Sequence, residues 1–503
     1  MNLENNFSDI LTERSRLFSN KIFCHKINGQ KVTFQELEQY VNQCCRFFEE
    51  IGLIAGDITT ISIPNSISFI VLYIAGIRSG IKINPCPSSL SEHELVKNIN
   101  FVECKLLISH QAIDSDLIPK DCFTFRFKND DHLLSKLESY SKQKFEREIC
   151  SDDVACIYYS SGTTGDAKCV LYSHKNMLSL TKSIVNDFEF IPESIHLGIL
   201  PLGHTAITNY QLLPSLYAGS TLFLADNFNS IRQDIWKIIT DLNISYLQVV
   251  PTILFAMTAT PYDEEDVRAN RSLKYIGCGS APLSIESQIK FYKRFNVKVA
   301  NLYGLSETGP SHFDNPLLAN WEPGSIGYPL TVNECKIFSK EFNELKAGEI
   351  GQIGLKGDNV FVGYHKNNKA YQNSFSNDYF LTGDLGYKDD NGRYYFTDRE
   401  KDLIIKAGVN IIPGEIEEII FKLQNVKSAA VIGVPHKLFG EEIVAFVEKK
   451  DSSLQKKHVM DVLTENLQPL KRPDRIIFID NMPVGPSGKI LKRELRKKLD
   501  ISE

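Results

Sequence analysis

A buried strand that runs straight into a loop of hydroxyl side chains and glycines constrains this chain most. The apolar run from Val154 to Tyr159 predicts the strand. Glycines let backbone N–H groups approach an anion closely, hydroxyls add donors, and a lysine adds a mobile positive charge. The loop therefore suits a triphosphate, and its candidate ligands are Ser160, Ser161, Gly162, Thr163, Thr164, Gly165 and Lys168.

This loop is not a Walker A motif. In that motif the two glycines are five residues apart and a lysine directly follows the second. Here Gly162 and Gly165 are three apart, and Asp166 and Ala167 precede the lysine. On composition alone such a run is more often a surface turn, so the function depends on what the rest of the chain adds.

The bulk composition is that of a soluble multidomain protein. At 503 residues the chain exceeds one ordinary hydrophobic core, so two or more domains are expected. The net charge of −6 gives no overall attraction to nucleic acid or to anionic membranes. The longest apolar run, Phe69 to Ile77, is too short to span a bilayer.

The cysteines and the N-terminus favour a cytoplasmic location. The 11 cysteines include no C-x-x-C pair, which is typical of free thiols in a reducing compartment. The first ten residues lack the basic and apolar regions of a signal peptide. The histidines show no metal-ligand spacing, and the absence of a G-x-S-x-G elbow leaves a serine hydrolase unsupported.

The pattern of elements predicts an α/β multidomain fold. Thr33 to Gly52 is typical of an amphipathic helix, with Thr33 and Glu36 forming a capping box. Strands separated by helices predict two mixed or parallel sheets sandwiched by helices, and residues 348–384 predict a small β-rich subdomain. We expect a large N-terminal domain over residues 1–400 and a small, mobile α+β domain over 401–503.

Four further segments are weak signals when each is taken alone. Gly277 to Pro282 follows the strand-like run 273–276 but lacks the third glycine of a dinucleotide fingerprint. Tyr303 to Glu307 places an aromatic ring, a hydroxyl and a carboxylate around one glycine. Asp384 follows a glycine, where it is well placed to accept ribose hydroxyls, and Lys489 follows a stiff Pro/Gly loop. Separately, most such segments are turns or solvated surface residues.

Together, in this order and spacing, the segments resemble the adenylate-forming superfamily, which includes acyl- and aryl-CoA ligases, luciferases and peptide-synthetase adenylation domains. The resemblance extends from Thr33 to Lys489. It implies a two-step reaction. A carboxylate attacks the α-phosphate of ATP to give an acyl-adenylate and pyrophosphate, and a thiol then displaces AMP.

The resemblance also assigns roles to residues. The loop 160–165 and Lys168 would hold the β- and γ-phosphates, Ser306 would donate to a phosphate, and Glu307 would help to hold Mg²⁺. Asp384 would accept from the ribose hydroxyls, with Arg399 on the ribose–phosphate side. Lys489 would bridge the substrate carboxylate and the α-phosphate. The hinge would be Lys401, rotation about which brings the segment around Gly408 over the site. The adenine pocket would be lined by Gly279, Ser280, Ala281, Pro282 and Tyr303.

The acyl pocket is predicted to be apolar. The resemblance places His204 at its carboxylate end, although a hydrogen-bonded core histidine is an equal interpretation. No acidic side chain lies between Gly203 and Leu212, which disfavours an amino-acid substrate. Leu302 and bulky Tyr210 are expected to shorten the cavity. By register with aryl-CoA ligases, its lining is Ala206, Tyr210, Gly277, Leu302, Gly304, Pro310 and Ser311, of which Ala206 and Gly277 are expected to open it.

The sequence departs from the family pattern at three places. Ala167 and Cys169 replace the usual proline and glycine on either side of the loop lysine, and Ser306 replaces a threonine. After the hinge, Ile405 stands where many thioester-forming members have a lysine, and Lys406 follows it. A nucleotide-binding homologue with weakened catalysis therefore remains an alternative.

The expected activity is ATP- and Mg²⁺-dependent ligation of an apolar aryl or short-to-medium acyl acid to a thiol. Coenzyme A is the first choice of acceptor, and the phosphopantetheine of an acyl or peptidyl carrier protein is the second. The basic run from Lys489 to Lys498 would suit either acceptor, although a solvated helix is the simpler interpretation. No nucleic-acid partner is expected, and the chain is predicted to be a monomer or a homodimer.

Overall fold

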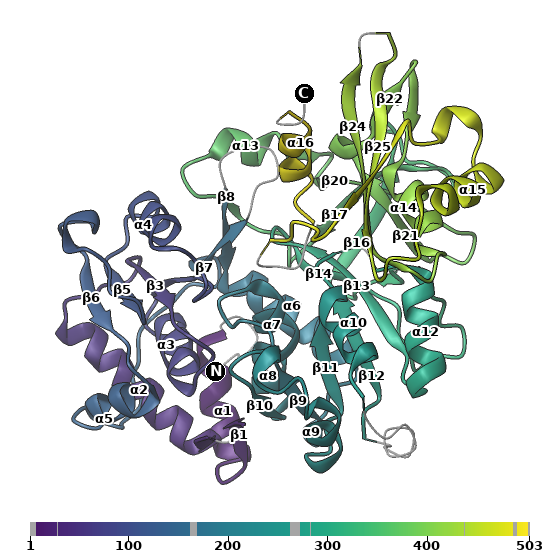
Figure 1. Ribbon diagram of the computed structural model, residues 1–503. Helices are drawn as coiled ribbons and strands as arrows, with labels where there is room; N and C mark the ends of the chain where they lie inside the picture. Colours follow the sequence, from purple (N-terminus) through teal and green to yellow (C-terminus); the bar gives the residue numbers. More distant parts are fainter. Residues whose placement is uncertain are drawn as a thin grey trace.

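The computed structural model describes residues 7–27, 29–160, 168–261, 272–281, 283–436, 438–485 and 490–500. The fold is α/β, as predicted. Figure 1 shows two large sheets in the purple-to-teal part of the chain and a smaller yellow-green C-terminal part to one side of them.

A nine-stranded sheet forms the centre of the N-terminal part. Its six middle strands, from β13 to β1 in the order below, run parallel, and antiparallel strands extend both edges. The order is β15 (Tyr328–Pro329), β14 (Gly309–Phe313), β13 (Val299–Leu305), β12 (Tyr275–Gly279), β11 (Tyr246–Val249), β9 (Ile195–Gly198), β10 (Thr221–Leu224), β1 (Ile22–Lys26) and β2 (Lys31–Thr33).

A seven-stranded sheet holds the ends of the predicted phosphate loop. The loop leaves β7 and returns in β8, which pairs antiparallel with β7, with Ser160 opposite Lys168. A Walker A loop instead leads from a strand into a helix. The order is β18 (Gly363–Tyr364), β8 (Lys168–Ser173), β7 (Val154–Ser160), β4 (Lys82–Pro85), β3 (Ile58–Ser62), β5 (Leu106–Ser109) and β6 (Phe123–Arg126).

Helices fill the space between the two sheets. Helix α6 (His174–Asp187) contacts β8 of one sheet and β14 of the other, and every residue of α3 (Ile67–Arg78) is buried. One hydrophobic cluster extends across both sheets. Helix α2 (Phe34–Glu50) begins at Thr33 with the predicted capping box to Glu36.

The other α-helices and the π-helix that the structure describes in the N-terminal part are shorter than α3. They are α1 (Ile10–Leu17), α4 (Glu92–Phe101), α5 (Asp130–Leu137), α7 (Thr205–Ile207), the π-helical η3 (Thr208–Leu212), α8 (Leu213–Ala218), α9 (Ile235–Asp241), α10 (Pro251–Ala259), α12 (Ile285–Phe295) and α13 (Asn368–Gln372).

A third, antiparallel sheet forms the β-rich part that the glycine-rich pattern predicts. The turn Asp389 to Gly392 joins two antiparallel strands, as its sequence indicates. The order is β16 (Asn333–Phe338), β17 (Gly351–Gly357), β20 (Tyr379–Lys388) and β19 (Phe375–Ser376), with β21 (Tyr394–Arg399) also paired to β20.

The last hundred residues have a sheet and hydrophobic clusters of their own. The sheet order is β23 (Val409–Ile411), β22 (Ile404–Lys406), β25 (Gly440–Lys449) and β24 (Val426–His436), with β26 (Arg475–Ile479) paired to β25. Its helices are α14 (Pro413–Phe421), α15 (Lys456–Asn466) and α16 (Lys492–Asp500). Across the described ranges, none of the helices has the length and apolar character to span a bilayer.

Candidate functional site

The phosphate side of the site is where three distant segments meet. The Lys168 ammonium lies 4.5 Å from the ring centre of Tyr364, whose hydroxyl donates to Glu307 Oε1 at 2.9 Å. The backbone N–H of Phe361 donates to the Glu307 carbonyl at 2.9 Å. The fold therefore brings the predicted phosphate lysine and the predicted metal carboxylate to one place. Ser161 to Ala167 lie outside the described residues, as does the side chain of Ser160.

The predicted ribose ligand, Asp384, is a buried carboxylate whose partners include Tyr303 and Arg399. Tyr303 Oη donates to Asp384 Oδ2 at 2.8 Å, and Arg399 Nε lies 3.2 Å from Asp384 Oδ1. Asp384 and Arg399 are cross-strand neighbours on β20 and β21. Burial, followed by the negative charge of Asp384, raises the pKa of Tyr303, so the phenol stays protonated and remains a donor.

The adenine motif is a close approach of two strands. A Cβ on Gly279 would lie 2.8 Å from the Leu302 carbonyl, so only glycine fits there. Ser280 follows with φ of +69°, a left-handed conformation that directs the chain out of β12 towards Ala281. The strand-like run of the sequence covers 273–276, but Gly277 to Gly279 also belong to β12 because they pair in parallel register with its neighbours. Pro282 lies outside the described residues.

The turn between β13 and β14 carries two further predicted site residues. Ser306 and Glu307 are half-buried on this turn, and Gly304 is exposed at its start. A Cβ on Gly304 would lie 2.3 Å from the Gly309 carbonyl, which explains the glycine. Ser311 and Pro310 are buried on β14, where the Ser311 hydroxyl donates to the Tyr303 carbonyl at 3.3 Å.

The predicted acyl side lies beside α7 and η3. His204 caps α7, and its Nδ1 accepts from the Ala206 N–H at 3.1 Å. This bond fixes the ring orientation and makes Nδ1 the unprotonated nitrogen. Ala206 and Tyr210 are buried on the next turns.

The space next to Gly277 is occupied, contrary to the expectation that this glycine opens the cavity. A Cβ there would lie 2.5 Å from Tyr246 Oη and 2.7 Å from Leu302 Cδ1. These two side chains occupy the space that a larger residue at position 277 would need. The role of Leu302 in shortening the cavity stays a prediction, and the position of Tyr246 was not foreseen.

The hinge candidate, Lys401, lies in a short 3₁₀ turn (Glu400–Asp402) between β21 and β22. Gly408 has φ of +79° in the tight β22–β23 turn. Lys406 is buried, and its ammonium contacts both oxygens of Asp474 at 2.6 and 2.7 Å. This pairing gives Lys406 a structural role and agrees with the departure noted in the sequence.

Lys489, the predicted adenylation lysine, lies outside the described residues, but residues on either side of its segment are described. Val484 forms an antiparallel bridge with Ile490, and the Leu491 N–H donates to the Pro483 carbonyl at 2.8 Å. These bonds hold the residues before Lys489 next to the residues after it.

The predicted Mg²⁺ site has one protein ligand, the carboxylate of Glu307. Within the described ranges, no three or more His, Cys, Asp or Glu residues cluster as ligands for a metal ion. Mg²⁺ is usually held by one or two carboxylates together with substrate phosphates, so Glu307 beside Lys168 fits a metal that arrives with ATP.

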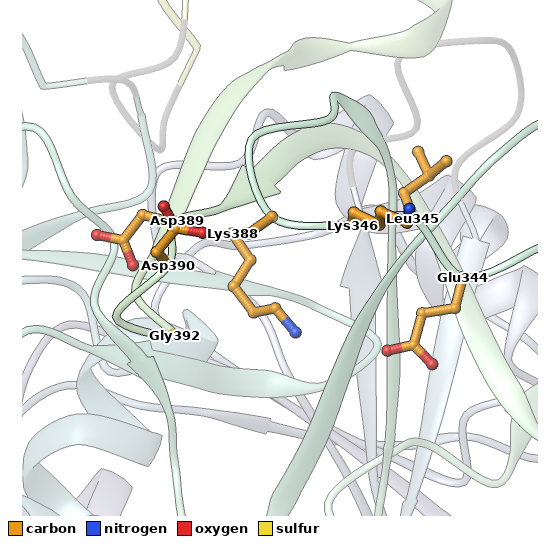
Figure 2. A pocket seen from close by; sticks show the side chains of 8 residues that line it. Glu344, Leu345, Lys346, Lys388, Asp389, Asp390 and Gly392 are labelled. Atoms are coloured by element: carbon orange, nitrogen blue, oxygen red, sulfur yellow. The ribbon is translucent and has the colours of Figure 1, made fainter.

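A surface hollow elsewhere contains none of the predicted site residues. Figure 2 shows it between the segment from Glu344 to Ala347 and the turn from Lys388 to Gly392, at the edge of the β-rich part. Its lining mixes both signs of charge and shares no strand or turn with Lys168 or Glu307.

Comparison with known proteins settles the family. The model of the AMP-binding enzyme family matches residues 11–365, and that of the AMP-binding enzyme C-terminal domain matches residues 415–489. The chain belongs to the AMP-binding enzyme family. Within this adenylate-forming superfamily it groups with the acyl- and aryl-CoA ligases.

Individual relatives cover almost the whole chain. Peroxisomal OPC-8:0-CoA ligase 1 of Arabidopsis thaliana is 30% identical over 94% of this chain and 90% of its own length. The long-chain-fatty-acid–CoA ligase FadD13 of Mycobacterium tuberculosis is 28% identical over 93% of each. ATP-bound MatB from Rhodopseudomonas palustris superposes with a TM-score of 0.90 at 28% identity, covering 99% of this chain and 100% of that one.

The arrangement of this AMP-binding enzyme is closer to the ATP-bound form of that protein than to its apo form. The TM-score falls from 0.90 for the ATP-bound structure to 0.80 for the apo structure, at the same identity and coverage. The geometry described above therefore corresponds to an arrangement that accepts ATP in that relative.

Sequence reasoning missed two sets of residues in this AMP-binding enzyme. Tyr364 bridges Lys168 and Glu307, and its sequence signal is no more than an aromatic ring after a glycine. The second set lies where Asp398, on the strand before the predicted hinge, contacts the C-terminal part. Asp398 Oδ2 accepts from the Gly414 N–H at 2.8 Å, and Lys492 lies 2.9 Å from Glu417.

Proposed function

We propose that this protein activates an apolar carboxylic acid with ATP and transfers the acyl group to the thiol of coenzyme A. In the first step a carboxylate oxygen attacks the α-phosphate of ATP and pyrophosphate leaves. In the second step the thiol sulfur attacks the acyl carbon of the adenylate and AMP leaves.

One observation carries the proposal. Lys168 and Glu307 meet through Tyr364, while Tyr303 orients Asp384 on the adjacent strands. In this proposal the residues around Lys168 would form a cationic phosphate side, and Asp384 would form an anionic ribose side. A nucleoside triphosphate needs cationic groups at its phosphates and a hydrogen-bond acceptor at its ribose hydroxyls.

The phosphate side stabilises charge that moves to the leaving group. Lys168 and the loop 160–165 would hold the β- and γ-phosphates, with a hydroxyl from Ser306. Mg²⁺ held by Glu307 would neutralise phosphate charge and orient the leaving pyrophosphate. Removing one donor from such a site typically costs about 3–4 kcal/mol in the barrier.

The nucleoside side fixes ATP for in-line attack. Asp384, oriented by Tyr303, would accept from the ribose hydroxyls, with Arg399 next to it. Gly279, Ser280, Ala281 and Pro282 would form the adenine pocket. A positioned bound geometry removes much of the entropic barrier of a bimolecular step.

His204 and Lys489 would act on the acid. His204, whose Nδ1 is occupied by the Ala206 N–H, would present Nε2 to the carboxylate end of the acyl pocket. Lys489 would bridge that carboxylate and the α-phosphate. Ala206, Tyr210, Leu302, Gly304, Pro310 and Ser311 would line the acyl chain.

The two parts of the chain, 1–400 and 401–503, would rotate about Lys401 between the steps. Lys401 is an exposed residue where the chain crosses from β21 to β22. After rotation the turn at Gly408 would replace the segment of Lys489 over the site, so that one site serves both reactions.

A panel of aryl and acyl acids, assayed for pyrophosphate release, tests the proposal. We expect release that depends on the acid, and Lys489→Ala should lower it by at least ~100-fold, on the scale of lost electrostatic stabilisation. Lys497→Ala, an exposed lysine of the same C-terminal segment, is the matched control and should behave as wild type. Release without any acid dependence would contradict the proposal.

The acceptor is identified in the second half of the assay. We expect CoA to convert the accumulated adenylate to a thioester. If only a phosphopantetheinylated carrier protein did so, the CoA assignment would be wrong although the adenylation step would stand. Tight ATP binding without turnover would instead indicate a nucleotide-binding homologue.

A further inference from the structure

Three neighbouring strands of the nine-stranded sheet contribute the residues around Gly277, which the family resemblance places in the acyl pocket. Tyr246 lies on β11, Gly277 on β12 and Leu302 on β13. The parallel register puts Tyr246 beside Tyr275, two residues before Gly277, so the side-chain positions share one face. The strands of Tyr246 and Leu302 flank β12 on opposite sides. An atom of each side chain lies within 2.7 Å of the place that a Gly277 Cβ would take.

Tyr246 is held in place by a hydrogen bond and by aromatic packing. Its hydroxyl donates to Gln248 Oε1 at 3.0 Å, and each of the two residues is only 1% exposed. Its ring centre lies 5.0 Å from that of Phe190 and 5.5 Å from that of Tyr275. A ring with a satisfied hydroxyl in such a cluster does not swing aside for a ligand without giving up this packing.

Tyr210, which is predicted to line the acyl pocket from η3, belongs to the same aromatic cluster as Tyr246. The Tyr210 ring, on η3, lies 5.9 Å from the ring of Phe188, which lies 6.1 Å from Tyr246. Burial raises the pKa of both tyrosines far above neutrality, so neither carries a charge in the pocket. Close-packed neutral side chains therefore occupy the region between η3 and the sheet beside Gly277.

We propose that Tyr246, fixed by Gln248 and backed by Leu302, sets the length of the acyl pocket and restricts this enzyme to short acyl chains. This inference rests on the proposed function. Tyr246 and Leu302 are specificity-determining residues that contact the end of the acyl chain, and Gln248 is a positioning residue. A chain that reaches Gly277 meets the Tyr246 hydroxyl.

The expected selectivity follows from the energetics of pocket size. One methylene that a hydrophobic pocket cannot accommodate changes kcat/KM by roughly 10-fold or more. We therefore expect kcat/KM for butanoate to exceed that for decanoate by at least ~10-fold. This contrasts with the substrate that the name of FadD13 gives for that relative.

The experiment measures acid-dependent pyrophosphate release for butanoate, hexanoate and decanoate with wild type and variants. Tyr246→Ala and Leu302→Ala should each raise the decanoate-to-butanoate ratio of kcat/KM at least ~10-fold, mainly through a lower KM for decanoate. Tyr246→Phe and Gln248→Leu keep the bulk but remove the anchoring bond, so we expect a several-fold shift in the same direction.

Leu247→Ala is the matched control. Leu247 is fully buried on the same strand, but it points to the other face of the sheet, so its loss costs stability without opening the pocket. Melting temperatures identify any variant that fails to fold, and Tyr246→Phe keeps the test available if Tyr246→Ala does. The length limit is overturned if wild type uses decanoate as well as butanoate, or if Leu247→Ala shifts the ratio as much as Tyr246→Ala. Absence of release with every acid overturns the proposed function itself.

Discussion

Asp398 connects the strand before the proposed hinge to the part that follows it. Its Oδ2 accepts from the Gly414 N–H at 2.8 Å, at the start of α14. Burial raises the pKa of Asp398, while the positive charge of Lys492 opposes that increase. Because Gly414 lies beyond Lys401 and Asp398 before it, rotation about the hinge would break this contact. We predict that Asp398→Ala weakens the arrangement used for adenylation.

The magnitude follows from the hydrogen bond that the variant removes. A hydrogen bond to a charged group contributes about 1.5–3 kcal/mol. Lys492 keeps Glu417 at 2.9 Å, so the variant does not leave a buried charge without a partner. We therefore expect the adenylation arrangement to be destabilised by about 2 kcal/mol, which lowers pyrophosphate release by about 30-fold.

The assay separates the two half-reactions. Pyrophosphate release reports the first, and conversion of a supplied acyl-adenylate to the thioester reports the second. Asp398→Ala should lower the first and leave the second within a few-fold of wild type. Glu415→Gln, which removes only a largely exposed contact to Lys471, is the control. An equal fall in both half-reactions, with the protein still folded, would refute this reasoning.

Three further predictions concern contacts elsewhere in the molecule. Tyr364→Phe keeps the ring beside Lys168 but removes the donor to Glu307, so the Mg²⁺ concentration that half-saturates pyrophosphate release should rise by about 10-fold; an unchanged requirement would count against Glu307 as the metal residue. Burial lowers the pKa of His196 from 6.5 to about 3. Below pH 6.5 the unfolded chain binds a proton there that the folded chain does not, so stability falls as the pH falls from 6.5 towards 3, by about 2 kcal/mol at pH 5. His196→Phe should make acid unfolding, followed by circular dichroism, correspondingly less steep, and an unchanged slope would argue against this cause. Lys406→Met breaks a partly exposed pair and should cost about 2 kcal/mol in urea unfolding, while thioester formation by the folded protein is retained; selective loss of that half-reaction would give Lys406 a catalytic role.

The sequence predicted helices, strands and turns well where a few neighbouring residues determine the local structure. The capping box at Thr33, the buried strand before the phosphate loop and the turn at Asp389 each follow from a few neighbouring residues. The strand before the adenine motif was expected to cover 273–276, but β12 continues to Gly279. Here the close approach of β12 to β13 requires Gly279 inside the strand.

The contacts that complete the site depend on tertiary structure. Asp384 was foreseen, but its bond to Tyr303 joins residues 81 positions apart. Tyr246 and Gln248 were missed because a buried strand of four residues gives no direction for its side chains. A polar glutamine in that strand was the available signal, since a buried amide needs a hydrogen-bond partner.

The central claim is that one site first forms an acyl-adenylate and then a thioester. The most direct test is a single-turnover reaction of the enzyme with ATP, Mg²⁺ and butanoate, analysed by mass spectrometry before and after CoA is added. We predict butanoyl-AMP in amounts close to that of the enzyme, followed by its conversion to butanoyl-CoA and AMP. Formation of ADP, or of a thioester without a detectable adenylate under these conditions, would contradict the account.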